Sequence, residues 1–265
     1  MTELERAALD HIRKVVDSVI GALSTPDVLP SGINTSILPV PYLSQFGPGA
    51  EKFTNDSGSA TGAMLVRAYT HQNITPSGFY DQTGQLEDIP LSFAQISNTM
   101  SANGVPAELR SGLRLADIPL ILFSGRPAIA LIQQTVLQQA GLSPELFQEP
   151  HYVVAVGMDV EQIIIHDPLR KDASRQAQGI PWVLFYQAWT RAERHERALL
   201  VPRQQLVRRV RVAATSLNVH QQPSSGAEVI DTVNAGELFE ITIQKNGWGK
   251  IGEERWISLS YTMEL

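Results

Sequence analysis

The stretch Asn55-Asp-Ser-Gly-Ser-Ala-Thr-Gly-Ala-Met-Leu65 decides how the rest of this chain is interpreted. A polar turn leads into a run of small residues, which continues into apolar ones. This order is typical of a loop that feeds the N-terminus of a buried helix. Ser57 then lies at a helix N-terminus, where unpaired backbone N–H groups and the helix dipole would stabilise the thiolate of a cysteine. The hydroxyl of a serine gains far less from this position, because it does not ionise near neutrality. The same position also suits a simple helix N-cap, for which serine is among the best residues.

The composition is that of an ordinary globular chain of 265 residues, with 43% hydrophobic residues, 18% charged residues, a formal net charge of −6 and no cysteine. This length fits one large domain, or one domain with a small module. The acidity argues against a nucleic-acid partner, which needs a basic face, and we interpret the run of Arg208, Arg209 and Arg211 as a solvated edge. Without cysteine, the chain has no disulfide and no thiolate metal ligand.

The sequence shows no targeting or membrane segment. No apolar stretch reaches the roughly 18 residues that a membrane span needs. The residues after Met1 lack the basic start and apolar core of a signal peptide. We therefore expect a soluble protein without a membrane span, which is either cytoplasmic or associated with the cell envelope.

The hydrophobic pattern predicts three parts along the chain. Residues 1–36 contain a helix, from about 4 to 23, and a linker rich in proline and glycine. Residues 37–205 indicate an α+β domain, and residues 206–265 hold short apolar runs between turns, which indicate a small all-β barrel. The elements expected in the α+β domain are the helix after Ser57, a polar stretch over 73–90, a helix over 91–103, a buried strand over 128–132, a hairpin of 151–157 with 162–167, and a helix or extended arm over 183–197.

Four residues match the requirements of nucleophilic acyl transfer, which needs a nucleophile, a histidine, a group that orients the histidine and an oxyanion donor. His151 begins the first strand of the hairpin, and antiparallel pairing brings it close to Asp167, which ends the second strand. His166 points to the opposite face of the sheet from Asp167, because side chains alternate along a strand. We therefore rank His151 above His166 as the catalytic base. Gln45, upstream of Ser57, carries an amide that can donate to an oxyanion. The remaining histidines are expected at the surface: His11, His71, His195 and His220.

Three motifs in this order resemble the C39-like peptidases of bacteria, a branch of the papain-like cysteine peptidase superfamily. Residues 40–45 resemble the opening V-P-Y-x-S-Q, residues 55–58 resemble N-D-C-G, and residues 151–157 with 166–169 resemble H-[YW]-V-V-V-x-G and D-P. The resemblance covers about 37–200 and implies a papain-like fold that acts on a peptide or protein substrate by hydrolysis or related acyl transfer. It implies a catalytic set of Ser57, His151, Asp167 and Gln45, with the substrate contacted by Asn55, Asp56 and Gly58. The departure is Ser57, which stands where the family has cysteine.

The C-terminal part resembles a bacterial SH3-type module. Residues 217–223 resemble L-N-V-R-x-x-P, residues 246–251 resemble N-G-W-x-K-V, and residues 256–258 resemble the end of G-W-V. His220 replaces the usual arginine, and Arg255 replaces the glycine. The resemblance implies a module that binds cell-wall peptides or packs against a catalytic domain. Trp248 and Trp256 are therefore either ligand-stacking or packing residues, and we favour packing.

Three interpretations of Ser57 stay open. The first is a cysteine peptidase whose nucleophile is replaced by serine and which is therefore inactive. The second is a natural non-catalytic protein that binds peptides or cell-wall material, and the third is a serine enzyme with His151 as base. No metal or cofactor is expected, because the chain has no H-E-x-x-H, paired-cysteine, G-x-G-x-x-G or P-loop pattern. It also lacks the G-x-S-x-G elbow of α/β-hydrolases around Ser57.

Overall fold

The computed structural model describes residues 36–46, 49, 57–85, 89–143, 150–171, 177–192, 197–206, 208–241 and 243–264. The chain divides into two compact units. The larger unit holds Val40–Gln205, and the smaller holds Leu206–Leu265 together with the short strand β1 (Ser36–Ile37). The predicted N-terminal helix lies outside the described residues.

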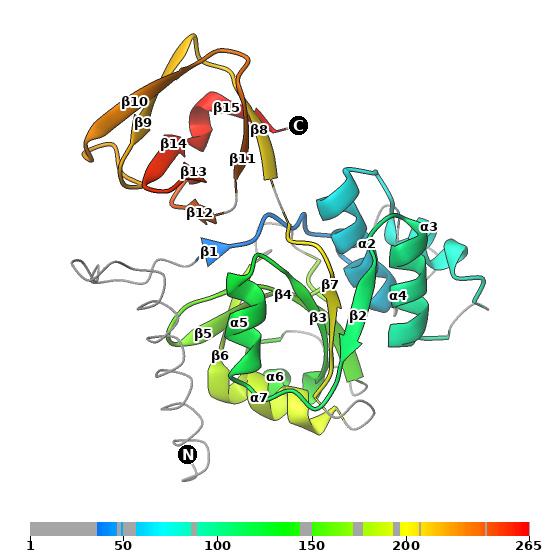
Figure 1. Ribbon diagram of the computed structural model, residues 1–265. Helices are drawn as coiled ribbons and strands as arrows, with labels where there is room; N and C mark the ends of the chain where they lie inside the picture. The colour runs from blue at the N-terminus through cyan, green and yellow to red at the C-terminus, as the bar shows by residue number, and fades with distance from the viewer. Residues whose placement is uncertain are drawn as a thin grey trace. The chain divides into compact units, whose positions relative to one another are not determined.

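The larger unit is built on an antiparallel sheet with helices packed against it (Figure 1). The strands run in the order β2-β7-β3-β4-β5-β6, and every neighbouring pair is antiparallel. This arrangement confirms the predicted α+β class. The strands are β2 (Ala107–Arg110), β3 (Ala128–Gln133), β4 (Pro150–Met158), β5 (Gln162–His166), β6 (Gln178–Pro181) and β7 (Leu199–Pro202).

Strands β3 and β4 form the centre of this sheet, and both of their faces are covered. Their apolar residues are almost completely buried, which explains why the sequence shows continuous apolar runs here in place of alternation. Helix α2 packs on β4, and helix α7 packs on β3. The helices are α2 (Ser57–Thr70), α3 (Pro76–Gln82), α4 (Phe93–Ala102), α5 (Asp117–Phe123), α6 (Gln134–Gln139) and α7 (Trp182–Arg191).

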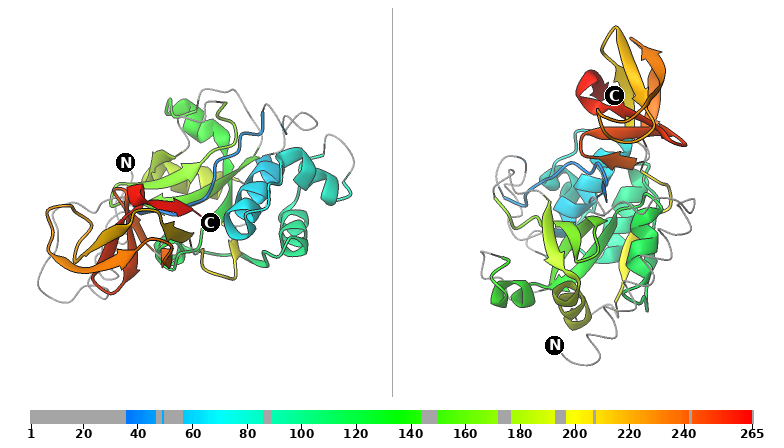
Figure 2. Two further views of the ribbon diagram at one scale, coloured as in Figure 1. Left: turned by 90° about the horizontal axis from the view of Figure 1, so that it is seen from above. Right: turned by 90° about the vertical axis from the view of Figure 1, so that its left-hand side faces the viewer.

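Helix α2 passes through the core next to α3 and α4, which group with it in both views of Figure 2. Its N-terminal half consists of small buried residues, so neighbouring elements approach closely. A Cβ on Gly62 would lie 2.8 Å from Cε1 of the buried Phe79, closer than real Cβ contacts allow. The glycine therefore sets the distance between α2 and α3.

The polar stretch over 73–90 contains a helix, α3, that the pattern does not predict. Thr75 caps this helix by accepting a hydrogen bond from the N–H of Gly78, and Pro76 occupies its first turn. The expected helix over 91–103 is confirmed as α4, which begins with a capping box between Ser92 and Gln95. The late segment is a helix, α7, and the alternative of an extended arm is wrong over its described residues.

The smaller unit is all-β, as predicted, and consists of two antiparallel sheets. Strands β10-β9-β14-β13-β12 form one sheet and β11-β8-β15 the other. Its core contains Val210, Val212, Leu217, Val219, Val233, Ile241 and Ile257. The strands are β8 (Arg208–Val212), β9 (Ser216–His220), β10 (Val229–Asn234), β11 (Leu238–Ile241), β12 (Ile243–Lys245), β13 (Trp248–Gly252), β14 (Arg255–Ser258) and β15 (Thr262–Glu264), with a 3-10 turn over Leu259–Tyr261.

The surface placement expected for His220 is wrong, because only 7% of this residue is exposed. Its Nδ1 donates to the carbonyl of Ala227 at 3.0 Å, and its ring meets Trp248 edge-on at 4.8 Å between centroids. These partners are distant in sequence, so no local pattern predicts the burial. His71, in contrast, is exposed as expected.

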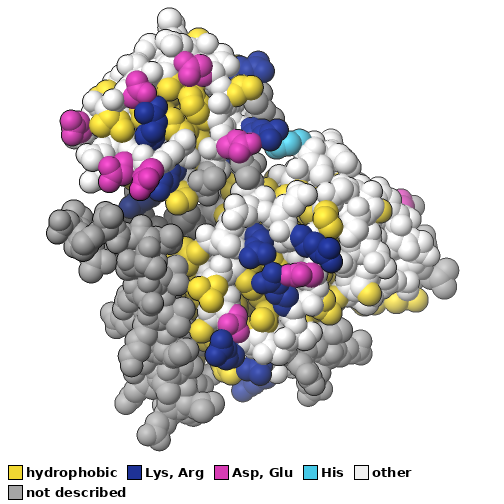
Figure 3. Space-filling view, in the orientation of Figure 1, with side chains coloured by type: hydrophobic (Ala, Val, Ile, Leu, Met, Phe, Trp, Pro, Cys, Tyr) yellow, Lys and Arg dark blue, Asp and Glu magenta, His cyan; other side chains and the backbone are white. Residues whose placement is uncertain are grey.

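Charges of both signs lie side by side on the face shown in Figure 3. In the arginine run that we interpret as a solvated edge, Arg209 pairs with Glu240 at 3.0 Å and Arg208 pairs with Glu264 at 3.0 Å. Within the described ranges, no helix is long and apolar enough to cross a membrane.

Candidate active site

Ser57 is the first residue of helix α2, and only 5% of it is exposed. Its hydroxyl oxygen accepts a hydrogen bond of 2.9 Å from the backbone N–H of Tyr152. The N–H groups of the first helical turn have no acceptor within the helix, and this end of the helix dipole is positive. The backbone donor and the helix end therefore both favour negative charge on the side-chain atom of residue 57.

His151 directly precedes Tyr152 in strand β4 and lies opposite Ile132 of β3. Its Nε2 is 2.7 Å from Oδ1 of Asp167, and the two side chains are 0% and 1% exposed. Asp167 directly follows β5, which pairs antiparallel with β4, so the hairpin brings the imidazole and the carboxylate together. Because an ionised carboxylate only accepts hydrogen bonds, Nε2 carries the proton of this pair, and Nδ1 is the nitrogen through which His151 can exchange a proton elsewhere.

Among the described residues, three groups donate hydrogen bonds to the Asp167 carboxylate. Oδ1 accepts from His151 and from the N–H of Leu169 at 3.0 Å, and Oδ2 accepts from Nε2 of Gln134 at 3.1 Å. Burial by itself would raise the pKa of Asp167. The positive charge of His151 and the hydrogen bonds from His151, Leu169 and Gln134 oppose it, and together they hold the pKa below its ordinary value. The site therefore keeps a carboxylate ionised in the protein interior.

Gln45 is fully buried, and its backbone N–H donates to the carbonyl of Pro168 at 3.0 Å. Two neighbours bond to the same segment: Ser44 Oγ to the carbonyl of Pro168 at 3.2 Å, and the Tyr42 hydroxyl to the carbonyl of Asp167 at 3.0 Å. Residues 42–45 therefore run along the chain that follows Asp167. The role of the Gln45 side chain as an oxyanion donor stays a prediction.

The other histidine of the motif, His166, has different partners. Its Nε2 lies 2.9 Å from the carbonyl oxygen of Val40, and its ring packs edge-on against Tyr42 at 5.7 Å between centroids. Both partners belong to the segment that leads to Gln45. His166 therefore anchors this segment, while His151 holds Asp167.

The predicted substrate-binding residues are described only in part. Gly58 is buried in the first turn of α2, where its carbonyl accepts a hydrogen bond of 3.1 Å from Oγ1 of Thr61. Asn55 and Asp56 lie outside the described residues. Within the part of the chain that is described, no cluster of three or more His, Asp or Glu side chains could hold a metal ion.

Two groups at this site escape sequence reasoning. The N–H of Tyr152 is a backbone donor, so no residue type announces it. Gln134 is a single glutamine among several, and its only signal is its position directly after the buried strand β3, which pairs with the strand that carries His151.

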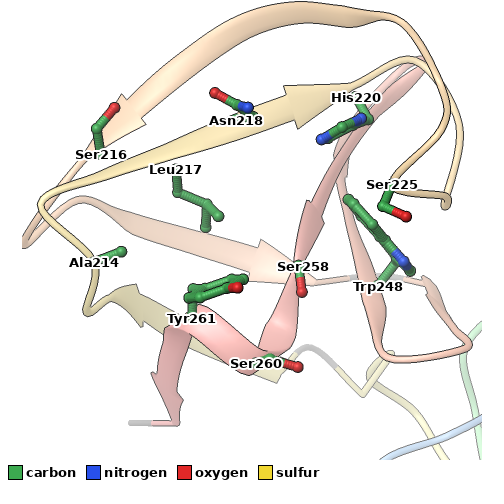
Figure 4. Close-up of a pocket in the computed structure, with 10 residues that line it drawn as sticks. All are labelled: Ala214, Ser216, Leu217, Asn218, His220, Ser225, Trp248, Ser258, Ser260 and Tyr261. Carbon is green, nitrogen blue, oxygen red and sulfur yellow. The ribbon is translucent and has the colours of Figure 1, made fainter.

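A second candidate site is a cavity of about 580 Å³ in the smaller unit. Figure 4 shows His220 and Trp248 on one side of it and Tyr261 on the other, with Ser258 between them. The rest of the lining consists of three serines, one asparagine and two aliphatic residues: Ser216, Ser225, Ser260, Asn218, Ala214 and Leu217. Among the described residues, the lining includes no Lys, Arg, Asp or Glu. The cavity thus combines aromatic surface with uncharged polar groups.

Comparison with known proteins finds one family model that matches the sequence and several solved structures that are similar. Residues 215–263 match the sequence model of the bacterial SH3 domain. No curated protein matches the sequence. A Bacillus anthracis protein described as a C39-like peptidase is similar in structure, at 14% identity and a TM-score of 0.47, over 64% of this chain and 98% of that one. The peptidase domain of Streptococcus ComA, a bifunctional ABC transporter of a quorum-sensing pathway, is similar at 18% identity and a TM-score of 0.42, over 61% and 97%. A double-glycine motif protease of an AMS/PCAT transporter, in complex with a leader peptide, is similar at 16% identity and a TM-score of 0.39. That similarity covers 64% of this chain and 99% of the protease.

Proposed function

We propose that the larger unit is a cysteine-peptidase-type acyl-transfer domain in which Ser57 occupies the nucleophile position, and that the chain with serine is catalytically silent. One arrangement carries this proposal. The buried Ser57 oxygen, at the first residue of α2, bonds to the N–H of Tyr152, and the adjacent His151 is held by Asp167 through Nε2. The domain boundaries proposed with it are those expected from the sequence: 37–205 for the peptidase-type domain, 206–265 for the SH3-like domain, and 1–36 for the N-terminal helix and linker. The structure differs at the first boundary, because the strand β1 (Ser36–Ile37) belongs to the smaller compact unit.

The arrangement suits a thiol better than a hydroxyl. A thiol at residue 57 transfers its proton to Nδ1 of His151, and the resulting pair is stabilised by Asp167, by the Tyr152 N–H and by the end of helix α2. The thiolate attacks the carbonyl carbon of a peptide, and Gln45 donates to the developing oxyanion. The C–N bond then breaks, His151 gives its proton to the leaving amine, and water hydrolyses the thioester. The hydroxyl of Ser57 does not ionise, so the first step fails.

A non-catalytic binding role is the alternative, and two observations favour it. The Ser57 oxygen already serves as the acceptor for a buried backbone N–H, which is a structural use. The cavity of the smaller unit offers the aromatic faces of Trp248 and Tyr261 and a set of uncharged polar groups. Such a lining fits an uncharged stretch of a peptide, because aromatic rings cover its carbon atoms while hydroxyls bond its amides. An uncharged stretch of a cell-wall peptide meets the same requirement.

The chemistry of residue 57 gives the deciding experiment. We expect no peptide cleavage by the chain as given, and cleavage by the Ser57→Cys variant when both are incubated with a peptide library and analysed by mass spectrometry. The activity should disappear on thiol alkylation and in the Ser57→Cys, His151→Ala double variant. Ser59→Cys is the matched control, since it places a buried thiol two residues further along the same helix.

Two outcomes would contradict the proposal in different ways. A Ser57→Cys protein that cleaves nothing, and whose thiol alkylates no faster than that of Ser59→Cys, would leave the binding role. Cleavage by the chain as given, abolished by a serine-acylating reagent, would establish a serine enzyme.

A further inference from the structure

We infer that Gln134 is a positioning residue, which fixes the Asp167 carboxylate in the orientation that holds His151. The inference rests on the proposed function for its catalytic consequence, but not for the geometry. Gln134 is fully buried at the start of helix α6, and its Nε2 donates to Oδ2 of Asp167 at 3.1 Å and to Oγ of Ser143 at 2.8 Å.

The two acceptors determine how the amide is oriented. A glutamine side chain has one NH₂ group and one oxygen, which are assigned from their partners. Turning the amide of Gln134 would set its oxygen against the Asp167 carboxylate, so only the NH₂ can face Oδ2. Its second hydrogen is directed to Ser143, which ties the amide at a second point.

The orientation has a cost that a purely structural side chain would avoid. The Oε1 atom of Gln134 is buried and has no hydrogen-bond partner among the described residues. A buried acceptor without a donor destabilises a fold, and an apolar side chain of the same size would leave none. The arrangement therefore serves the carboxylate more than it serves packing.

The effect of Gln134 on His151 follows from how the hydrogen-bond donors are divided between the two oxygens of the Asp167 carboxylate. Oδ1 receives the N–H groups of His151 and Leu169, whereas Oδ2 receives only Gln134 among the described residues. Without that donor, Oδ2 is an unpaired charged oxygen in the core, and rotation of the carboxylate becomes its route to a new partner. Rotation lengthens the 2.7 Å bond to Nε2, and the charged imidazole loses stabilisation.

The first test uses the chain as given and needs no activity. Proton NMR should show a strongly downfield resonance of the His151 Nε2–H, as expected for a short imidazole–carboxylate hydrogen bond. We expect Gln134→Met to shift this resonance upfield and broaden it. Gln178→Met is the matched control, because Gln178 bonds to Arg170 and to the Leu142 carbonyl without touching Asp167, and it should leave the resonance unchanged.

A second variant keeps the inference testable if Gln134→Met does not fold. In Gln134→Glu, a protonated side chain donates to Oδ2 as the amide does, whereas the ionised form repels the Asp167 carboxylate. The His151 resonance should therefore be present at low pH and lost as the pH rises, with no such loss in the parent. An unchanged resonance in folded Gln134→Met, or a resonance in Gln134→Glu that does not respond to pH, would overturn the inference.

The catalytic consequence is measured in the Ser57→Cys background. We expect Gln134→Met to slow alkylation of the introduced thiol at pH 6 by about tenfold, which corresponds to about 1.4 kcal/mol, with no change from Gln178→Met. If the thiol is not activated even with Gln134 in place, while the NMR resonance still depends on Gln134, the proposed function fails and the positioning role stands. An alkylation rate that Gln134→Met leaves unchanged in an activated thiol would overturn the positioning role.

Discussion

Replacing Asp167 by alanine should strongly destabilise the larger unit, because three donors then lose their acceptor inside the core: His151 Nε2, the Leu169 N–H and the Gln134 amide. An unmade buried hydrogen bond costs about 1–3 kcal/mol, and breaking a buried ion pair on one side costs about 3–5 kcal/mol, so we take about 3–5 kcal/mol for the site as a whole. At roughly 2–4 °C per kcal/mol for a unit of this size, the midpoint of thermal unfolding should fall by about 6–20 °C. Asp167→Asn should cost less, since it keeps an oxygen for the two donors at Oδ1.

The assay follows the tryptophans, which divide between the two units. Trp182 and Trp189 are fully buried in the larger unit, whereas Trp248 and Trp256 belong to the smaller. Urea unfolding of Asp167→Ala in a Trp248→Phe, Trp256→Phe background therefore reports the larger unit alone. A loss of less than about 1 kcal/mol, below the typical cost of one unmade buried bond, would refute the idea that the buried carboxylate organises the site.

The same carboxylate predicts the direction of the pH dependence. The pKa of Asp167 is lower in the folded protein than in the unfolded chain, so its contribution to stability is fully present above the unfolded value of about 3.9. That contribution is lost as the pH falls through the lower, folded value. The parent should lose stability more steeply below about pH 4 than Asp167→Asn does, because the variant has no carboxylate to protonate there. Parallel pH profiles of the two proteins would contradict this assignment.

Two further predictions concern packing and the second site. Gly62→Ala should destabilise the larger unit by about 1–3 kcal/mol, because the added Cβ overlaps the ring of Phe79. Adding Phe79→Leu should recover part of this loss, and urea unfolding measures both variants. An unchanged unfolding midpoint in Gly62→Ala would show that α2 and α3 separate freely. Tyr261→Ala should weaken binding of a neutral peptide by about 1–2 kcal/mol, as measured by titration calorimetry. Leu238→Ala is the control, because Leu238 is exposed and lies outside the cavity lining, and it should leave the affinity unchanged. Equal affinities of the two variants would place the peptide elsewhere.

The sequence predicts elements with a clear hydrophobic period better than those that lack one. Strand β3 and the hairpin of β4 and β5 are visible because apolar β-rich runs and a polar turn define them locally. Helix α3 is missed, since its capping residues look like loop residues until the helix they begin is seen. The capping box of α4, in contrast, accompanies a clear apolar period.

In the candidate site, too, some residues are predicted from local sequence motifs and others are not. Ser57, His151 and Asp167 follow from motif order, and two of their contacts, between His151 and Asp167 and between Ser57 and the residue after His151, are present in the structure. Gln134 and the burial of His220 depend on partners far along the chain, so a single sequence gives no pattern for them. Contacts of this kind are decided by tertiary packing.

The parts of the site come from distant points along the chain, and this has a consequence for how the protein is made. The bond between Tyr152 and Ser57 spans 95 residues, and that between Tyr42 and Asp167 spans 125. Because a chain is synthesised from its N-terminus, Ser57 leaves the ribosome long before Tyr152, whose N–H it accepts, and long before the His151–Asp167 pair. A chain still in translation, or one that stops before Asp167, holds residue 57 without an oriented imidazole. In a variant with cysteine at residue 57, any reactivity that the thiol acquires from these neighbours would therefore begin only after the sheet has closed.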